Sequence, residues 1–303
     1  MRRTASYLGL GAAAIAGAVY VARRRGDEGP PLAKVEGGER TKVETSDGAV
    51  LDVHVAGDGP AVVLPHCWTG TMEVWAPVAA KLVASGHRVI RYDQRGHGAS
   101  TAGADGFTIE RFGDDLHEVL EAVDVQDAVI AGHSLGGMTA QSFAIRHPDV
   151  LRERIRGLVL VGTAPAAVVW PTLARVTRRV LASPTLERRM RARGGPSFVR
   201  GVFGARPSRA AVRATRDAFV NTSPDVRVGV LDSLLNFDLR AQLHTISVPT
   251  VVVAGTRDTL TPARWSRAIA SAIPGARLET VKGAGHMLPY EVPDLLVGLI
   301  EQL

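Results

Sequence analysis

The stretch DAVIAGHSLGGMTAQSFAIRHP, residues 127–148, changes its pattern at Ser134. Before the serine, a short continuous apolar run is typical of a strand that is covered on both faces. After it, residues 135–147 are predicted to form a helix. A serine at such a junction, with Gly132 and Gly136 as its second neighbours, has the context of a GxSxG nucleophile elbow. We therefore expect a tight, strained turn that directs the Ser134 hydroxyl outward as a nucleophile.

Short strands and helices alternate along most of the chain. Two alternating runs around Asp47 and Gly48 predict a hairpin. Further strands are predicted at 60–66, 87–93, 127–132, 157–162, 250–255 and 276–281, and helices at 72–85, 108–125, 135–147, 262–273 and at the C-terminus. This alternation predicts an α/β fold, with a mainly parallel sheet that carries helices on both faces.

A long, mostly helical segment separates the strand at 157–162 from that at 250–255. We predict that residues 167–245 form a helical cap over the carboxyl ends of the strands. Residues 168–245 hold fourteen arginines against one glutamate and four aspartates, in a chain of net charge +6. Two interpretations of this basic segment stay open. It faces an anionic lipid or an anionic substrate, or its arginines form solvated helix faces. It lacks the aromatic-interleaved patches of nucleic-acid binders, so no nucleic-acid partner is predicted.

Residues 1–25 form a separate N-terminal segment. Residues 5–22 are uncharged and arginines flank both ends; as a helix this run would span roughly 27 Å, close to the thickness of a hydrocarbon core. We predict an uncleaved membrane anchor, a linker at 26–40 and a membrane-associated protein. The alternatives are a cleaved secretory signal or a peripheral tail, and hence a secreted or cytoplasmic protein. Because basic residues flank both ends, orientation in a membrane stays open.

Two later residues complete a catalytic set with the serine. A serine hydroxyl needs a base to take its proton, and the base needs an acid that fixes its tautomer. Asp258 follows the strand at 250–255, and His286 lies in the loop after the strand at 276–281. Carboxyl ends of parallel strands meet at one edge of a sheet, so we predict that Ser134, Asp258 and His286 act together. The Leu135 N–H, at a helix N-terminus, is a predicted oxyanion donor.

Several motifs occur together in a set order. They are PHCWTG at 65–70, YDQRGHGAS at 92–100, GHSLGG at 132–137, GTRD at 255–258 and GAGH at 283–286. From about Thr41 to Leu303 the chain resembles α/β-hydrolase-fold proteins of the esterase, lipase and cofactor-free haloperoxidase group. The resemblance implies an eight-stranded sheet, a domain over 41–303 and a second oxyanion donor at the N–H of Trp68. Cys67 stands where the family has glycine. Asp93, Arg95 and His97 match a turn with a structural role.

The predicted function is hydrolysis of carboxylic esters through an acyl-enzyme intermediate, on a small-molecule ester or lipid substrate. Peracid-forming haloperoxidase-like enzymes and carbon–carbon hydrolases use the same triad and stay open as alternatives. The non-enzyme alternative is a membrane-attached binding protein on the same fold, with a membrane surface contacted through residues 5–22 and the basic cap. No cofactor or metal is predicted, since no HExxH spacing occurs and Cys67 is the single cysteine. The oligomeric state stays open.

Overall fold

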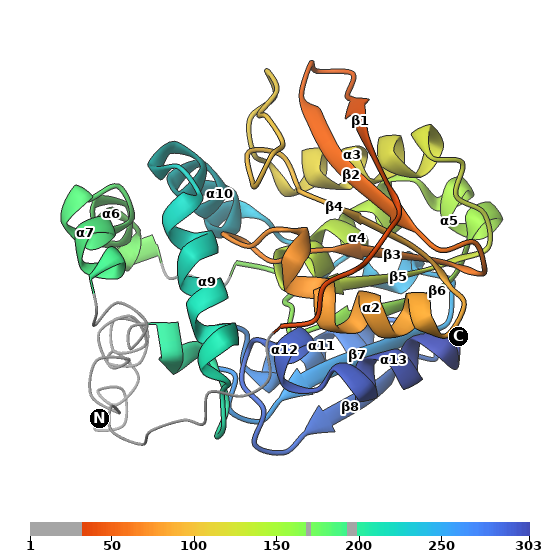
Figure 1. Ribbon diagram of the computed structural model, residues 1–303. Coiled ribbons are helices and arrows are strands. Elements are labelled where there is room, and N and C mark those ends of the chain that lie inside the picture. Colours follow the sequence, from red (N-terminus) through yellow and green to blue (C-terminus); the bar gives the residue numbers. More distant parts are fainter. Residues whose placement is uncertain (1–31, 168–170, 193–198) are drawn as a thin grey trace, which may run out of the picture.

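An eight-stranded sheet forms the centre of the computed structural model, which describes residues 32–167, 171–192 and 199–303. The strand order is β1-β2-β4-β3-β5-β6-β7-β8 (Figure 1). β1 pairs antiparallel with β2, and β2 with β4. The remaining neighbours are parallel. The predicted α/β class and the mainly parallel eight-stranded sheet are confirmed.

The strands occupy the segments whose apolar patterns predict them. Every residue of β3, β5 and β7 is buried, because helices cover both faces of these central strands. The bounds are β1 (Glu39–Glu44), β2 (Val50–Ala56), β3 (Ala61–Pro65), β4 (Arg88–Tyr92), β5 (Ala128–His133), β6 (Ile155–Val161), β7 (Thr250–Gly255) and β8 (Arg277–Val281). β1 therefore begins inside the segment 26–40, which the sequence analysis assigned to a linker.

Helices cover each face of the sheet. One face carries α3 (Ile109–Ala122), α4 (Leu135–Arg146), α5 (Pro148–Arg154) and α11 (Ala263–Ala272), and the other carries α2 (Ala76–Ala84), α12 (Leu288–Glu291) and α13 (Pro293–Glu301). α3 begins after Thr108, whose side chain accepts a hydrogen bond from the Arg111 N–H. Short 3-10 turns at Met72–Trp75 and Leu243–Thr245 precede α2 and β7.

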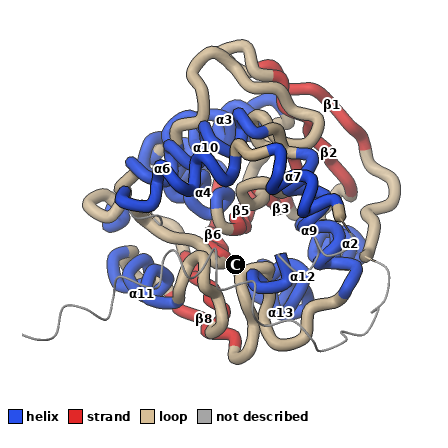
Figure 2. Tube along the Cα trace, turned by 90° about the vertical axis from the view of Figure 1, so that its left-hand side faces the viewer, coloured by secondary structure: helices blue, strands red, loops and turns tan. Residues whose placement is uncertain are grey.

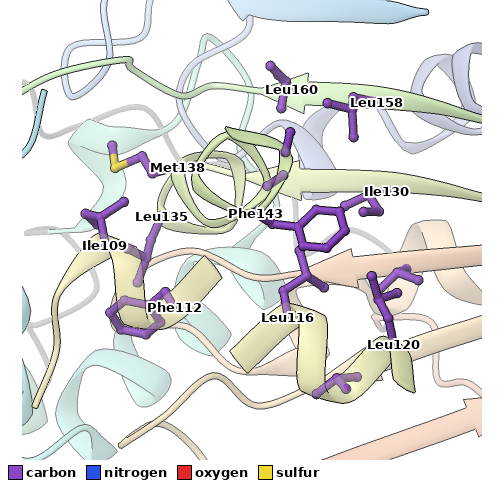
Figure 3. Close-up of a cluster of buried hydrophobic side chains, with 14 of the residues drawn as sticks. Ile109, Phe112, Leu116, Leu120, Ile130, Leu135, Met138, Phe143, Leu158 and Leu160 are labelled. Carbon is purple, nitrogen blue, oxygen red and sulfur yellow. The ribbon is translucent and has the colours of Figure 1, made fainter. Parts of the chain in front are cut away.

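α4 is buried along most of its length between the sheet and α3. Phe112 and Leu116 of α3 pack near Met138 and Phe143 of α4, with Ile130 of β5 in the same cluster (Figure 3). A fully buried apolar side chain of this size contributes about 1.5–3 kcal/mol to folding. This core holds the N-terminus of α4, and with it Ser134, in a fixed position.

In the described parts of the chain, four α-helices lie between β6 and β7, namely α6 (Pro171–Leu181), α7 (Pro184–Arg191), α9 (Arg209–Asn221) and α10 (Pro224–Asn236). They lie together at the end of the sheet opposite the C-terminus (Figure 1), and Figure 2 looks onto them with the strands behind. An antiparallel bridge between Ala166 and Asp238 joins the two ends of this segment. All four helices fall within the range 167–245; that they cap a site stays a prediction.

The predicted membrane location is corrected. Among the described residues, no helix combines the length and apolarity that crossing a membrane requires. Residues 5–22, on which the predicted anchor depended, lie outside the described residues, as does the whole segment 1–25. Neither a membrane-associated location nor a membrane surface as partner is retained.

Candidate active site

Ser134 occupies a strained turn between β5 and α4. Its φ of 54° and ψ of −111° lie in a region that non-glycine residues rarely adopt. The turn requires its two glycines: a Cβ on Gly132 would lie 2.3 Å from the Gly136 carbonyl oxygen, and a Cβ on Gly136 would lie 2.1 Å from the Pro65 oxygen. The spacing of the GxSxG motif therefore follows from close backbone packing on both sides of the serine.

Neighbouring strands hold this turn in place. The Ser134 N–H donates to the backbone carbonyl oxygen of Val161 at 2.9 Å, and Thr163 Oγ1 donates to the backbone carbonyl oxygen of Ser134 at 2.7 Å. Backbone strain of this kind costs about 1–3 kcal/mol and persists only where the surroundings determine the conformation. The Ser134 side chain makes no capping hydrogen bond to α4, so its hydroxyl is not used to start the helix.

His286 and Asp258 form a buried pair. His286 Nδ1 lies 2.8 Å from Asp258 Oδ2, and the side chains are 5% and 0% exposed. Burial by itself raises the pKa of Asp258, but the charge and hydrogen bond of His286 outweigh it and lower that pKa below its usual value. The carboxylate stays ionised, so it accepts the Nδ1–H of His286 and selects the tautomer of the neutral ring that carries its proton on Nδ1.

Thr261 supports this pair, and the sequence analysis did not single it out. Its hydroxyl lies 2.7 Å from Asp258 Oδ2 and 3.2 Å from His286 Nδ1. The N–H groups of Leu260 and Thr261 each donate to Asp258 Oδ1 at 2.8 Å. The signal was present as a threonine three residues after the aspartate, a spacing at which an aspartate accepts hydrogen bonds from the following backbone.

His133 connects the elbow to the loop that carries His286. Its Nε2 lies 2.8 Å from the His286 carbonyl oxygen, so the Nε2–H donates there. Burial lowers the pKa of His133 to about 3, and the nearby His286 adds to this effect. His133 is therefore neutral near pH 7. Within the described residues no hydrogen bond joins Ser134 Oγ to His286; the hydrogen bond from His133 brings their backbones together.

The two predicted oxyanion donors lie on adjoining backbone segments. In the described part of the chain, the N–H groups of Trp68 and Leu135 donate no hydrogen bond. The close approach of Gly136 to Pro65 places the start of α4 against the end of β3, the strand that leads into the Trp68 loop. Thr69 follows with a φ of 56°, so this loop is also backbone-strained.

Two neutral histidines hold the Trp68 loop. His66 Nε2 accepts the Gln94 N–H at 2.9 Å, so its Nδ1–H donates to the Cys67 oxygen at 2.7 Å. His97 Nε2 accepts the Thr69 N–H at 3.1 Å. Burial lowers the pKa of His66 to about 4 and that of His97 to about 3. Both rings therefore act as fixed hydrogen-bonding groups.

Gln94 links this loop to α4. Its Nε2 donates to the His66 oxygen at 2.5 Å, and its Oε1 accepts from Thr139 Oγ1 at 2.7 Å. The sequence analysis did not single out Gln94, since it lies in the strand-end turn 92–100 and the hydrogen-bond partners belong to remote segments. The link ties the segment of one predicted oxyanion donor to the helix of the other.

The turn that contains Gln94 makes mainly structural contacts. Asp93 accepts the N–H groups of Met72 and Ala99, at 2.7 and 2.9 Å. Arg95 is fully buried between two carboxylates, with Nε 2.6 Å from Asp115 and Nη1 2.9 Å from Asp47. These contacts join the turn to the hairpin and to α3.

Cys67 is a buried thiol. It is 6% exposed and packs in a cluster with Val74 and Met287. Burial raises the pKa of its thiol to about 12, so the thiolate that a cysteine nucleophile requires is not populated near pH 7. Over residues 32–167, 171–192 and 199–303, no group of three or more His, Cys, Asp or Glu side chains is arranged to hold a metal ion.

Comparison with known proteins identifies the family of this chain. A family model described as "alpha/beta hydrolase fold" matches residues 60–293. The chain belongs to the α/β hydrolase fold family. The match covers β3 to the start of α13 and therefore includes every residue of the candidate site.

The relatives of this α/β hydrolase are named for different activities. A pimeloyl-[acyl-carrier protein] methyl ester esterase of Chromobacterium violaceum is 33% identical over 268 residues, which cover 84% of this chain and 98% of the relative. A non-heme chloroperoxidase of Kitasatospora aureofaciens is 28% identical over 273 residues, covering 86% and 98%. The structure of an enol-lactonase from Burkholderia xenovorans LB400 has a TM-score of 0.75 and 26% identity, covering 87% of this chain and 98% of that one.

Proposed function

We propose that this α/β hydrolase cleaves carboxylic esters through an acyl-enzyme intermediate. The buried hydrogen bond between His286 Nδ1 and Asp258 Oδ2, at 2.8 Å, carries the proposal. It sets the tautomer that a general base for Ser134 requires, and the elbow leaves the serine hydroxyl uncommitted to the helix. The similarity to an esterase supports a hydrolase. That the bond cleaved is a carboxylic ester is our own addition.

In the first half-reaction, His286 Nε2 takes the proton of Ser134 Oγ as the oxygen attacks the ester carbonyl. The N–H groups of Trp68 and Leu135 stabilise the negative charge that develops on the carbonyl oxygen. Asp258 stabilises the imidazolium, which then protonates the leaving alcohol. An acyl group remains bonded to Ser134 Oγ.

The second half-reaction repeats these steps with water. His286 Nε2 takes a proton from the water, which attacks the acyl carbonyl, and the same two N–H groups hold the oxyanion. His286 then returns the proton to Ser134 Oγ, and the carboxylic acid leaves.

Labelling with a fluorophosphonate probe and turnover of a p-nitrophenyl ester test the proposal. Ser134→Ala should abolish both, with a nearly unchanged thermal midpoint. The matched control is Ser142→Ala, because Ser142 is a buried serine on α4, the helix that begins after Ser134, and has no proposed role. This variant should keep both labelling and turnover. Retained turnover in Ser134→Ala would refute the assignment, and folded wild-type protein that takes no label would favour a binding protein.

Peracid formation by the same residues is a second candidate. The similarity to a chloroperoxidase, at 28% identity over 86% of this chain, favours it. In that reaction hydrogen peroxide takes the place of water in the second half-reaction and releases a peracid. Wild-type protein with acetate, peroxide and bromide would brominate an indicator if this activity is present, and Ser134→Ala would not.

A further inference from the structure

Arg227 on α10 is a charged side chain that solvent does not reach. Its exposed fraction is 0%, and among the described residues none of its three guanidinium nitrogens has a hydrogen-bond partner. It is ion-paired with Glu187 on α7, but Nη2 lies 3.6 Å from Glu187 Oε2, beyond a hydrogen bond. Its guanidinium carbon lies 4.9 Å from the centre of the Phe219 ring. A buried cation whose donors lack hydrogen-bond partners is destabilising by itself. A ligand that accepts hydrogen bonds from these donors would remove that cost.

The residue before Arg227 packs on the turn that holds the Trp68 loop. A Cβ on Gly96 would lie 2.8 Å from Val226, so the start of α10 packs closely on this turn. Gly96 precedes His97, and His97 accepts the Thr69 N–H of the Trp68 loop. α10 is thus positioned by the same turn that positions a predicted oxyanion donor.

Phe219, the aromatic neighbour of Arg227, gives a second and independent link between Arg227 and the candidate active site. Phe219 packs against a cluster that contains Cys67 and Met287. Cys67 is adjacent in sequence to Trp68, and Met287 is adjacent to His286. The helices that carry Glu187 and Phe219 therefore pack in a cluster that borders the Trp68 loop and His286, and α7, α9 and α10 face the viewer in Figure 2.

The charges around Arg227 leave its guanidinium incompletely paired. Glu187 also pairs with Arg191 at 3.0 Å, and the Arg191 side chain is 56% exposed, so Glu187 is shared between a solvated arginine and a covered one. The side chain of Glu187 is 31% exposed and Arg227 is fully covered. A planar guanidinium binds a carboxylate through two parallel N–H bonds, and a ligand carboxylate would pair the donors that Glu187 leaves unbonded.

We propose that Arg227 binds a carboxylate of the substrate at a distance from the scissile bond, so that the preferred substrates are monoesters of dicarboxylic acids. This inference depends on the proposed ester hydrolysis. The excess of arginine over acidic residues in the segment 168–245 then attracts such substrates to the site.

The test compares esters of equal length with and without a carboxylate. Wild-type enzyme should have a higher kcat/KM on monomethyl glutarate and monomethyl adipate than on methyl pentanoate and methyl hexanoate. Arg227→Met should lower kcat/KM on the anionic esters by about 10- to 150-fold, the range expected for hydrogen bonds to a charged group. Its kcat/KM on the neutral esters should not fall. Arg227→Lys, which keeps the charge without the planar fork, should lose less.

Glu187→Gln is the matched control. If Arg227 serves only as an ion-pair partner that holds α7 and α10 together, Arg227→Met and Glu187→Gln should lower the thermal midpoint alike and leave the anionic-to-neutral ratio unchanged, which would overturn the proposal. If Arg227 binds substrate, Glu187→Gln should keep or raise that ratio, because a competing carboxylate is removed.

A binding measurement separates this proposal from that of ester hydrolysis. Glutarate and adipate should raise the thermal midpoint of Ser134→Ala, and should not raise that of Ser134→Ala combined with Arg227→Met. This result supports the carboxylate site even if wild-type protein cleaves no ester. Equal shifts in the two variants would overturn the site, whatever the turnover.

Discussion

Lowering the pH from 7.5 to 5.5 should destabilise the protein through three buried histidines. Burial lowers the pKa of His66 to about 4, and that of His97 and His133 to about 3, while an unfolded chain has histidine near 6.5. Below pH 6.5 the unfolded chain therefore binds protons that the folded chain does not. Each histidine lowers the unfolding free energy by about 1.3 kcal/mol over this interval, and the three together by about 4 kcal/mol.

Three buried carboxyl groups of the described residues work in the opposite direction. Burial raises the pKa of Asp93, Asp115 and Glu291, so the folded chain binds protons at these residues before the unfolded chain does. Their contribution to stability increases as the pH falls. Other carboxyl groups, Asp47 and Asp258 among them, have a lowered pKa and lose stability as the pH falls, so variants are required to isolate the histidine contribution.

Urea unfolding at pH 7.5 and at pH 5.5 measures the effect. His66→Gln and His133→Gln should each reduce the loss of unfolding free energy between the two pH values by about 1.3 kcal/mol relative to wild type. His244→Gln, at an exposed position, is the control without a buried imidazole. A reduction of less than half the expected value in both buried variants would mean that these rings are protonated inside the folded protein, and the argument from burial would fail.

Two further variants test how the elbow and the Trp68 loop are held. Gly136→Ala should lower kcat by about 10²–10³-fold, as for loss of an oxyanion donor, because its Cβ would lie 2.1 Å from the Pro65 oxygen. Gly298→Ala in α13, where a Cβ meets nothing within 4 Å, should leave kcat unchanged, and equal effects would contradict the packing argument. Gln94→Leu removes the hydrogen bonds of the side-chain amide and should lower kcat on p-nitrophenyl esters more than it raises KM; Thr139→Ser, which keeps the hydroxyl, should not.

Much of the fold could be predicted from local pattern. β3, β5 and β7 are continuous apolar runs because they are covered on both faces, and α3 shows its amphipathic period because one side faces solvent. α5 was not predicted, since it follows α4 after only His147 and begins at Pro148. The predicted membrane location was wrong, since no helix of the described residues is long and apolar enough to cross a membrane.

Local sequence is enough to specify the GxSxG turn and the order of Ser134, Asp258 and His286, because backbone constraints and strand ends act over a few neighbouring residues. Which remote groups support these residues depends on how the chain folds. Gln94 meets Thr139 across 45 positions, and His133 meets the His286 backbone across 153. Local pattern likewise shows that the segment 168–245 is rich in arginine. Which arginine is removed from water and left with unpaired donors depends on how α7, α9 and α10 pack, because burial is a property of the assembled fold.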